Sequence, residues 1–265
     1  MITSVANAKV KNVMQLNSKA KARREQHSFV VEGAKMFYEA PKDKVKEVYV
    51  SSSFFAKKIQ EKELAEYNYE VVSDEVFEKM SDTKTPQGIL CVVEMFDYHL
   101  EDLINKEDGV WIVLEELQDP GNLGTIMRTG EGAGIAGLIM SKNTADIYNP
   151  KTIRATMGSI YRIPFVYVAD LDLIFDRFAK EKIVSYAAHL SGTQYYDEIE
   201  YEKKVAFVIG NEGNGLSEKV ADRTDSYLKI PMQGEVESLN AAIATSVLMY
   251  ETFRQRRKKQ LVSDC

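Results

Sequence analysis

Short apolar runs recur along the whole chain, and polar or amphipathic stretches separate them. In the first hundred residues the runs are typical of β-strands, and the stretches between them have helical spacing. The expected strands are at 28–33, 45–52, 69–73 and 88–96, and the expected helices at 17–27, 34–40, 53–68 and 74–82. This alternation predicts an α/β unit with a mostly parallel sheet covered by helices.

A second α/β series follows a polar stretch at residues 97–109. Its expected strands are at 110–117, 137–142, 165–169, 182–189, 204–210 and 226–232. The run 205–209 is apolar throughout, as in a central parallel strand that is buried on both faces. Ligands of open α/β sheets bind beyond the carboxyl ends of the strands, so the loops after Leu117, Ile209 and Met232 are the expected site.

Composition excludes several classes of protein. The 265 residues suffice for one large or two modest domains, and no stretch is long and apolar enough to span a bilayer. The N-terminus lacks the apolar core of a secretory signal. Cys91 and Cys265 form neither a disulfide framework nor a metal site. We therefore expect a cytoplasmic protein without a membrane or metal partner.

Charge is unevenly distributed on a chain whose net charge is −6. The first 24 residues contain no acidic side chain, and residues 254–260 form a second basic cluster. Such patches attract phosphates, although two solvated chain ends would look the same. The basic residues of the first segment are Lys9, Lys11, Lys19, Lys21, Arg23 and Arg24.

The glycines at residues 132–137, GAGIAG, match the spacing of dinucleotide-binding loops, but their context is wrong. That fingerprint needs a strand before it and a helix after it, whereas here an expected helix precedes and a strand follows. We interpret these glycines as a helix end and a turn. A dinucleotide oxidoreductase is therefore a poor reading of the chain.

Three other segments have a pattern that points to a site. In the first, a turn places Asn122 as the N-cap of a helix that later contains Arg128. In the second, residues 210–215 hold three glycines, which allow backbone to approach a ligand or another segment closely. A capped helix with a solvent-facing arginine, and a flexible loop, are the structural alternatives.

The third segment is IPMQGEVESLN, residues 230–240, followed by small residues. Ser238 is expected to cap a helix whose N-terminus suits a carboxylate or phosphate. Alanines at 241–244 allow another element to pack closely, although an ordinary amphipathic helix explains the apolar stripe. That predicted stripe consists of Leu239, Ala242, Ile243, Val247 and Tyr250.

Together these segments resemble the SpoU family of RNA ribose methyltransferases, within the SPOUT superfamily. Residues 122–128 match its N-x(5)-R motif, 210–216 its G-N-E-G-x-G-L motif, and 230–240 its I-P-M-x-G-x-x-x-S-L-N motif. Residues 148–165 also resemble the family's stretch between the first two motifs. The resemblance covers roughly residues 109–255, and the usual valine after S-L-N is replaced by Ala241.

The N-terminal unit is similar to the substrate-binding domain often attached to this family, an α/β/α module related to RNA-binding ribosomal proteins. Residues 23–40 and 85–93 carry this weaker match. The resemblance implies an RNA-binding domain at 1–97, a linker at 98–108 and a catalytic SPOUT α/β domain with a deep trefoil knot at 109–265. The implied RNA contacts are Lys19, Lys21, Arg23, Arg24 and Arg154.

The family also implies a cofactor, S-adenosylmethionine, held bent inside the knot. The implied reaction is in-line attack of a ribose 2′-hydroxyl on the sulfonium methyl group, and the implied assembly is a homodimer. Ribosomal RNA of the 23S type is the expected substrate; transfer RNA, or a non-catalytic role in binding RNA on the ribosome, are the alternatives. The implied cofactor contacts are Gly210, Asn211, Gly213, Ile230, Met232 and Leu239.

Catalytic roles follow from the same resemblance. Arg128 is implied to activate the hydroxyl, either as a base or, because a guanidinium stays protonated, by binding phosphate and stabilising the alkoxide. Asn122 is expected to orient Arg128 or the ribose, and Glu212 to pair with a basic group or accept a ribose hydrogen bond. Ser238 and Asn240 are expected to fix the helix start and polar groups of cofactor or RNA.

Overall fold

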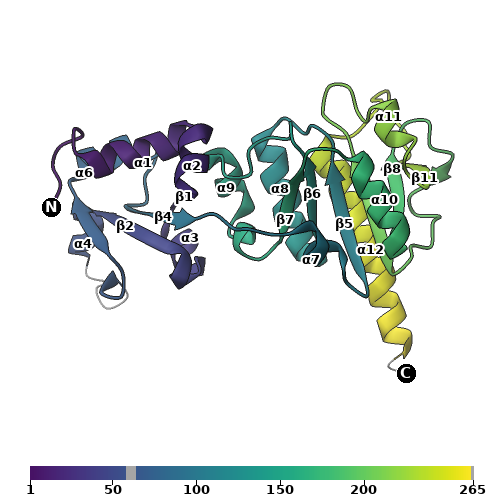
Figure 1. Cartoon of the computed structure of the whole chain (residues 1–265), viewed down its shortest axis with the longest axis horizontal. Helices are drawn as coiled ribbons and strands as arrows, with labels where there is room; N and C mark the ends of the chain where they lie inside the picture. Colours follow the sequence, from purple (N-terminus) through teal and green to yellow (C-terminus); the bar gives the residue numbers. More distant parts are fainter. Residues whose placement is uncertain (58–63, 264–265) are drawn as a thin grey trace. The chain divides into compact units, whose positions relative to one another are not determined.

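The computed structural model describes residues 1–57 and 64–263. It divides into two compact units by contacts within the chain (Figure 1). The first comprises Met1–Asp97 and Asp146–Tyr161, and the second comprises Tyr98–Ala145 and Arg162–Cys265. No helix of the described residues is long and apolar enough to cross a membrane.

The first unit is built on a four-stranded sheet with the order β1-β4-β2-β3. Strand β4 is antiparallel to both its neighbours, and only β2 and β3 are parallel. The expectation of a mostly parallel sheet is therefore wrong for this unit. Helices cover both faces, so buried strands look alike in either direction. The strands are β1 (Ser28–Glu32), β2 (Val45–Ser51), β3 (Tyr69–Val72) and β4 (Ile89–Glu94).

Helices α1 (Ala8–Ser18) and α6 (Asp74–Met80) pack on one face of this sheet. Val10, Val13 and Leu16 recur at helical spacing and are fully buried there. Of the helix expected at 53–68, α4 covers Ser52–Ala56, and residues 58–63 lie outside the described part. The other helices of this unit are α2 (Ala20–Gln26), α3 (Ala34–Glu39), η1 (Lys42–Lys44), α9 (Pro150–Thr156) and η2 (Ser159–Tyr161).

Residues 146–161 join the first unit although they lie between two strands of the second. The ring of Tyr148 packs on Phe29, with centroids 4.6 Å apart, and the Tyr161 hydroxyl donates to the Met36 carbonyl at 2.9 Å. Asp146 forms an ion pair of 2.6 Å with Arg23. This segment therefore adds a helix and a buried charge pair to the N-terminal fold.

The second unit contains a seven-stranded, wholly parallel sheet with the order β7-β6-β5-β10-β8-β11-β9. Its central strand β10 is buried over residues 205–209, as the apolar run predicts. The parallel arrangement brings the carboxyl ends of β5, β10, β8 and β11 to one edge. The strands are β5 (Gly109–Leu114), β6 (Gly137–Ser141), β7 (Phe165–Val168), β8 (Val184–Ala188), β9 (Gln194–Tyr195), β10 (Lys204–Ile209) and β11 (Ser226–Lys229).

Alternating residues of β5 and β10 face two helical layers. Trp111 and Val113 belong to a core with side chains of α10 (Asp172–Glu181) and α11 (Glu218–Ala221). Helix α12 (Ala241–Ser263) packs against α8 (Pro120–Ala133) and contacts β5 and β10 (Figure 1). The expected linker 98–108 contains α7 (Leu100–Ile104), whose Leu103 and Ile104 are buried in the core of this unit.

Candidate functional site

The three segments singled out by the sequence meet through side-chain hydrogen bonds at one end of the second unit. Asn122 Nδ2 donates to Glu212 Oε1 at 2.7 Å, and Asn240 Nδ2 donates to Asn122 Oδ1 at 3.1 Å. Asn122 lies in α8, Glu212 follows β10, and Asn240 precedes α12. The chain Asn240–Asn122–Glu212 therefore joins residues that are up to 118 positions apart.

Glu212 is the acceptor on which this network ends. Backbone amides of Gln118 and Asp119 donate to its two oxygens at 3.1 and 3.2 Å, in addition to the Asn122 amide. Partial burial raises the pKa of Glu212, but the donated hydrogen bonds outweigh this, and the net pKa lies below its usual value. The carboxylate is thus ionised at neutral pH, and the network loses its acceptor only in acid, as pH falls through the lowered pKa.

Helix α8 begins differently from the prediction. Its N-cap is Asp119, whose Oδ1 accepts from the Asn122 backbone N–H at 2.8 Å, and Pro120 opens the helix. The assignment of Asn122 as N-cap is therefore wrong. The dipeptide Asp119-Pro120 is the signal that was missed, because proline is favoured at the first helical position. Gly134, at φ 71°, ends the helix, which confirms that GAGIAG is a helix end and turn.

Helix α12 also starts later than predicted. Asn240 Oδ1 accepts from the backbone N–H groups of Ala242 and Ile243 at 2.9 and 3.3 Å, so Asn240 is the cap and Ser238 is not. Ser238 is exposed in the preceding loop and has no hydrogen bond among the residues described. Asn240 thus uses its oxygen to cap α12 and its nitrogen to hold Asn122.

Substitution of Asn240 tests this assignment. Asn240→Ala is expected to lower the free energy of unfolding by about 1–2 kcal/mol, because α12 loses its cap. Ser238→Ala is the matched control and should leave stability within about 0.5 kcal/mol. Urea denaturation followed by circular dichroism measures both. Equal stability losses in the two variants would contradict the cap at Asn240.

The glycine-rich loop after β10, residues 210–215, is held in a tight turn by hydrogen bonds between its own residues. Asn211 and Gly215 exchange two backbone hydrogen bonds of 3.1 Å, and Asn211 Oδ1 accepts from the N–H groups of Gly213 and Asn214. A Cβ at buried Gly210 would lie 2.0 Å from the Gly215 carbonyl carbon. Only glycine fits at residue 210, because the loop folds back directly over it.

Two acidic residues after β5 were not predicted: Glu115 anchors the end of this loop, and Glu116 bonds the loop after β6. Glu115 accepts hydrogen bonds from the backbone and hydroxyl of Ser217, at 2.8 and 2.6 Å. Ser217 in turn caps the short helix α11. Glu116 has a positive φ of 52°, and its side chain accepts from Asn143 at 2.8 Å. The pair Glu115-Glu116 directly after an apolar strand was the available signal.

Arg128 lies in α8 with its side chain exposed. Within residues 1–57 and 64–263 its guanidinium has no hydrogen bond or ion pair. A cation without an internal partner is available to an anionic ligand such as a phosphate. The structure therefore does not hold Arg128 against Asn122, which bonds Glu212 and Asn240 instead.

The predicted cofactor residues lie on the loops that follow β10 and β11, the two strands that flank β8 in the sheet. Ile230, Met232 and Leu239 are half-buried on the loop after β11, and Gly210, Asn211 and Gly213 belong to the loop after β10. Half-buried apolar side chains beside closely approached backbone suit a purine with polar edges. These residues therefore fit an adenosine-containing cofactor. Leu190, on the loop after neighbouring β8, is 66% exposed and was not predicted.

The predicted RNA contacts of the first unit divide into three kinds. Lys19, Lys21 and Arg24 are exposed. Arg154 is ion-paired with Asp82. Arg23 is only 3% exposed, and besides Asp146 it donates to the Leu16 and Asn17 carbonyls. The prediction that Arg23 contacts RNA is therefore wrong, because its guanidinium is consumed by internal acceptors. His189 packs on Tyr227 in the second unit.

The described part of the chain contains no cluster of metal-binding side chains. No group of three or more His, Cys, Asp or Glu side chains there could hold a metal ion. Cys91 is buried, and Cys265 lies outside the described residues. The arrangement of the site instead offers an ionised carboxylate with three hydrogen-bond donors, two oriented amides and an arginine that has no partner among the described residues.

Comparison with known proteins shows which family models and which relatives match this chain. The family model for the SpoU rRNA Methylase family matches residues 109–250, and that for the MRM3-like substrate binding domain matches residues 7–91. Over 251 residues the chain is 33% identical to the 23S rRNA (guanosine(2553)-2′-O)-methyltransferase RlmP of Bacillus subtilis. That match covers 94% of this chain and 97% of the relative.

Two solved structures are similar over both units. One is the AdoMet-bound rRNA methyltransferase from Sinorhizobium meliloti, with 31% identity and a TM-score of 0.83, covering 96% of this chain and 97% of that one. The other is the SpoU methyltransferase AviRb from Streptomyces viridochromogenes in complex with AdoMet. It has 26% identity and a TM-score of 0.85, and the match covers 95% and 98% of the two chains.

Proposed function

This chain belongs to the SpoU rRNA methylase family, and from that membership we propose that it transfers a methyl group from S-adenosylmethionine to a ribose 2′-hydroxyl of RNA. The family match covers residues 109–250, which include most of the second unit, and relatives with this activity or this cofactor match the chain almost end to end. The single observation that carries the proposal is the Asn240–Asn122–Glu212 network, which joins the three motif segments.

Ribosomal RNA of the 23S type is the proposed substrate. RlmP, whose name specifies 23S rRNA, matches 94% of this chain and therefore both of its units. The substrate-binding domain matched at residues 7–91 agrees with an RNA substrate, and a cytoplasmic location is part of this proposal. Transfer RNA is the second candidate, because the same fold of the second unit would serve either RNA.

The proposed chemistry divides between cofactor and protein. S-adenosylmethionine, when bound, supplies an activated methyl group on a sulfonium. The half-buried side chains of Ile230, Met232 and Leu239 would hold its adenine, and the closed loop at 210–215 would approach it with backbone. Alignment of reacting groups alone can lower a barrier by roughly 7–11 kcal/mol. Orientation is therefore the main task of this chain.

Arg128 is proposed to bind the phosphate next to the target ribose and to stabilise the alkoxide that develops. A guanidinium stays protonated in proteins, so Arg128 does not remove the hydroxyl proton. Asn122, Glu212 and Asn240 act as positioning residues that fix the start of α8, the helix that also carries Arg128, to the start of α12. Ser238, exposed and unbonded within the described residues, is left to contact cofactor or RNA.

A trefoil knot is proposed for the second unit. The segment after β11 enters α12, which packs against α8, β5 and β10. Close packing of α12 on α8 and the match to the SpoU family support a crossing of chain segments in this unit. Ala242, 2% exposed, adds the small side chain that such a crossing needs.

A homodimer is proposed from the second apolar face of α12. Only part of the predicted stripe is buried: Ala242 is buried with Leu248 and Met249, whereas Ile243 and Tyr250 are 51% and 48% exposed. Helical spacing places the exposed pair on one face, to which Phe253 and Val247 also belong. An apolar face of this kind typically packs against another chain.

Analytical ultracentrifugation tests the dimer. At micromolar concentration the wild-type protein should sediment with twice its 30.0 kDa mass, and the double variant Ile243→Asp/Tyr250→Asp should sediment as a monomer. Leu173→Asp, at an exposed apolar residue of α10, is the matched control and should remain dimeric. A monomeric wild type would refute the proposed assembly.

The proposed activity is tested with tritiated S-adenosylmethionine and RNA from cells that lack this protein. Label should enter 23S rRNA at one ribose and should not enter transfer RNA. Calorimetry with the cofactor alone separates an enzyme from a pure RNA-binding protein, which need not bind it. Absence of both cofactor binding and label in any RNA would exclude the activity, and label only in transfer RNA would select the second candidate.

A further inference from the structure

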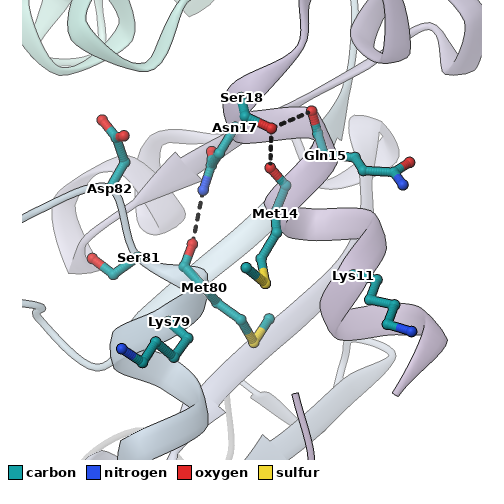
Figure 2. Close-up of a pocket in the computed structure, with 9 residues that line it drawn as sticks. All are labelled: Lys11, Met14, Gln15, Asn17, Ser18, Lys79, Met80, Ser81 and Asp82. Atoms are coloured by element: carbon teal, nitrogen blue, oxygen red, sulfur yellow. Dashed lines mark hydrogen bonds between the residues drawn. The ribbon is translucent and has the colours of Figure 1, made fainter. Parts of the chain in front are cut away.

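A groove in the first unit lies between α1 and the end of α6. It has a volume of about 400 Å³, within the range of ordinary ligand sites. Lys11, Met14, Gln15 and Ser18 occupy positions i, i+3, i+4 and i+7 of α1, so they form one face of that helix, distinct from its buried face. Figure 2 shows Lys79 on the facing helix, with Met14 and Met80 between the two lysines.

The charge of this groove is positive. The ammonium groups of Lys11 and Lys79 have no ion pair among the residues described, and both side chains are exposed. Asp82 is the one acid of the lining described, and Arg154 neutralises it through an ion pair. Two uncompensated cations on opposite walls of a groove attract a phosphodiester.

The floor and walls are preformed. Asn17 Nδ2 donates to the Met80 carbonyl at 2.8 Å and ties α1 to the end of α6. The side chain of Gln15 makes no hydrogen bond within the described residues, so its amide is free to bond a base edge. Met14 is 37% exposed and offers a polarisable thioether to an aromatic ring. The groove thus combines cations, one free amide and one apolar surface.

We propose that this groove binds one unpaired nucleotide of the RNA substrate. Lys11 and Lys79 contact its phosphates, while Met14 and Gln15 contact the base. The proposal rests on the proposed function, because it assumes that the substrate is RNA. Unpaired nucleotides fit best, since proteins read RNA bases mainly where they are free of a helix.

Steady-state kinetics of the full-length protein with protein-free 23S rRNA tests the site. Lys11→Ala/Lys79→Ala should raise the KM for RNA about tenfold at 0.1 M salt, with kcat unchanged, because two phosphate contacts are lost. The slope of log KM against log salt should fall by about 1.4, since each single-stranded contact contributes about 0.7. Gln15→Ala should raise KM without changing this slope.

Lys35→Ala/Lys42→Ala makes the same change in net charge on the same unit and is the matched control. Its KM should remain within about twofold of wild type. Cross-linking of 4-thiouridine-labelled RNA to the wild-type protein gives a second readout that needs no variant: the labelled peptides should include residues 11–18 or 79–82. Equal KM in the two double variants, or cross-links elsewhere only, would overturn the proposal.

Two other experimental outcomes separate a failure of the proposed function from a failure of the nucleotide assignment. If wild-type protein transfers no methyl group to any RNA, the proposed function fails and not the groove alone. If the groove variant is impaired only with assembled ribosomal subunits and binds free RNA normally, the groove takes a protein partner, and the nucleotide assignment is wrong.

Discussion

Replacing Arg128 with alanine is expected to reduce kcat for methyl transfer by about a hundredfold to a thousandfold, while the affinity for S-adenosylmethionine stays within about twofold. The magnitude is that of losing one preorganised group that stabilises developing negative charge. Cofactor affinity should survive because Arg128 is exposed on α8 and belongs to none of the apolar walls proposed for the adenine. Single-turnover transfer and calorimetry measure the two quantities.

Two further variants make this expectation specific. Arg177→Ala removes an exposed arginine of the same unit, paired to Glu101 at 3.3 Å, and should leave kcat unchanged. Arg128→Lys keeps the charge but loses the planar donor fork, so it should retain only part of the rate. Methyl transfer by Arg128→Ala at a near wild-type rate would remove Arg128 from the proposed mechanism.

Gly210→Ala is expected to abolish cofactor binding and to destabilise the second unit by roughly 3 kcal/mol or more. The added Cβ would lie 2.0–2.1 Å from the Gly215 carbon and oxygen and the Leu216 nitrogen. These are backbone atoms and cannot move aside without opening the loop. The two Asn211–Gly215 hydrogen bonds would then be lost with the surface that the loop presents.

A glycine of the loop after β11 provides the control for this variant. At Gly234 an added Cβ meets nothing within 4 Å. Gly234→Ala should therefore retain the wild-type thermal midpoint and cofactor affinity. Calorimetry measures the cofactor affinity, and thermal unfolding measures the midpoint. Normal cofactor affinity in Gly210→Ala would show that the loop at 210–215 is not part of the pocket.

The central strands of the second unit could be predicted because burial on both faces makes them apolar throughout, as at residues 205–209, whereas the exposed, two-residue strand β9 (Gln194–Tyr195) was not predicted. The direction of the strands in the first unit could not be predicted. Strand β4 lies between β1 and β2, and its apolar run would look the same in a parallel or an antiparallel strand. Helix starts were misplaced by two or three residues. Several polar side chains near each start compete for the cap, and only Asp119 and Asn240 have the required geometry.

The proposed site residues could be grouped from the sequence only through the motifs that contain them. Asn122, Glu212 and Asn240 meet in the structure, but no periodicity links positions 90 or more residues apart. The role of Arg23 illustrates the opposite case. Among six basic residues in the first 24, nothing local marks the one that is buried, because its partner Asp146 is 123 residues away.

The attachment of residues 146–161 to the first unit has a practical consequence for dissecting this protein. The polypeptide passes between the units three times, after residues 97, 145 and 161, so a single cut cannot separate them. A recombinant piece ending at residue 97 would retain Arg23 but lack its counterion, and an uncompensated buried charge costs about 3–5 kcal/mol. An N-terminal unit that is to be stable on its own must therefore include residues 146–161, joined to residue 97 by an engineered linker.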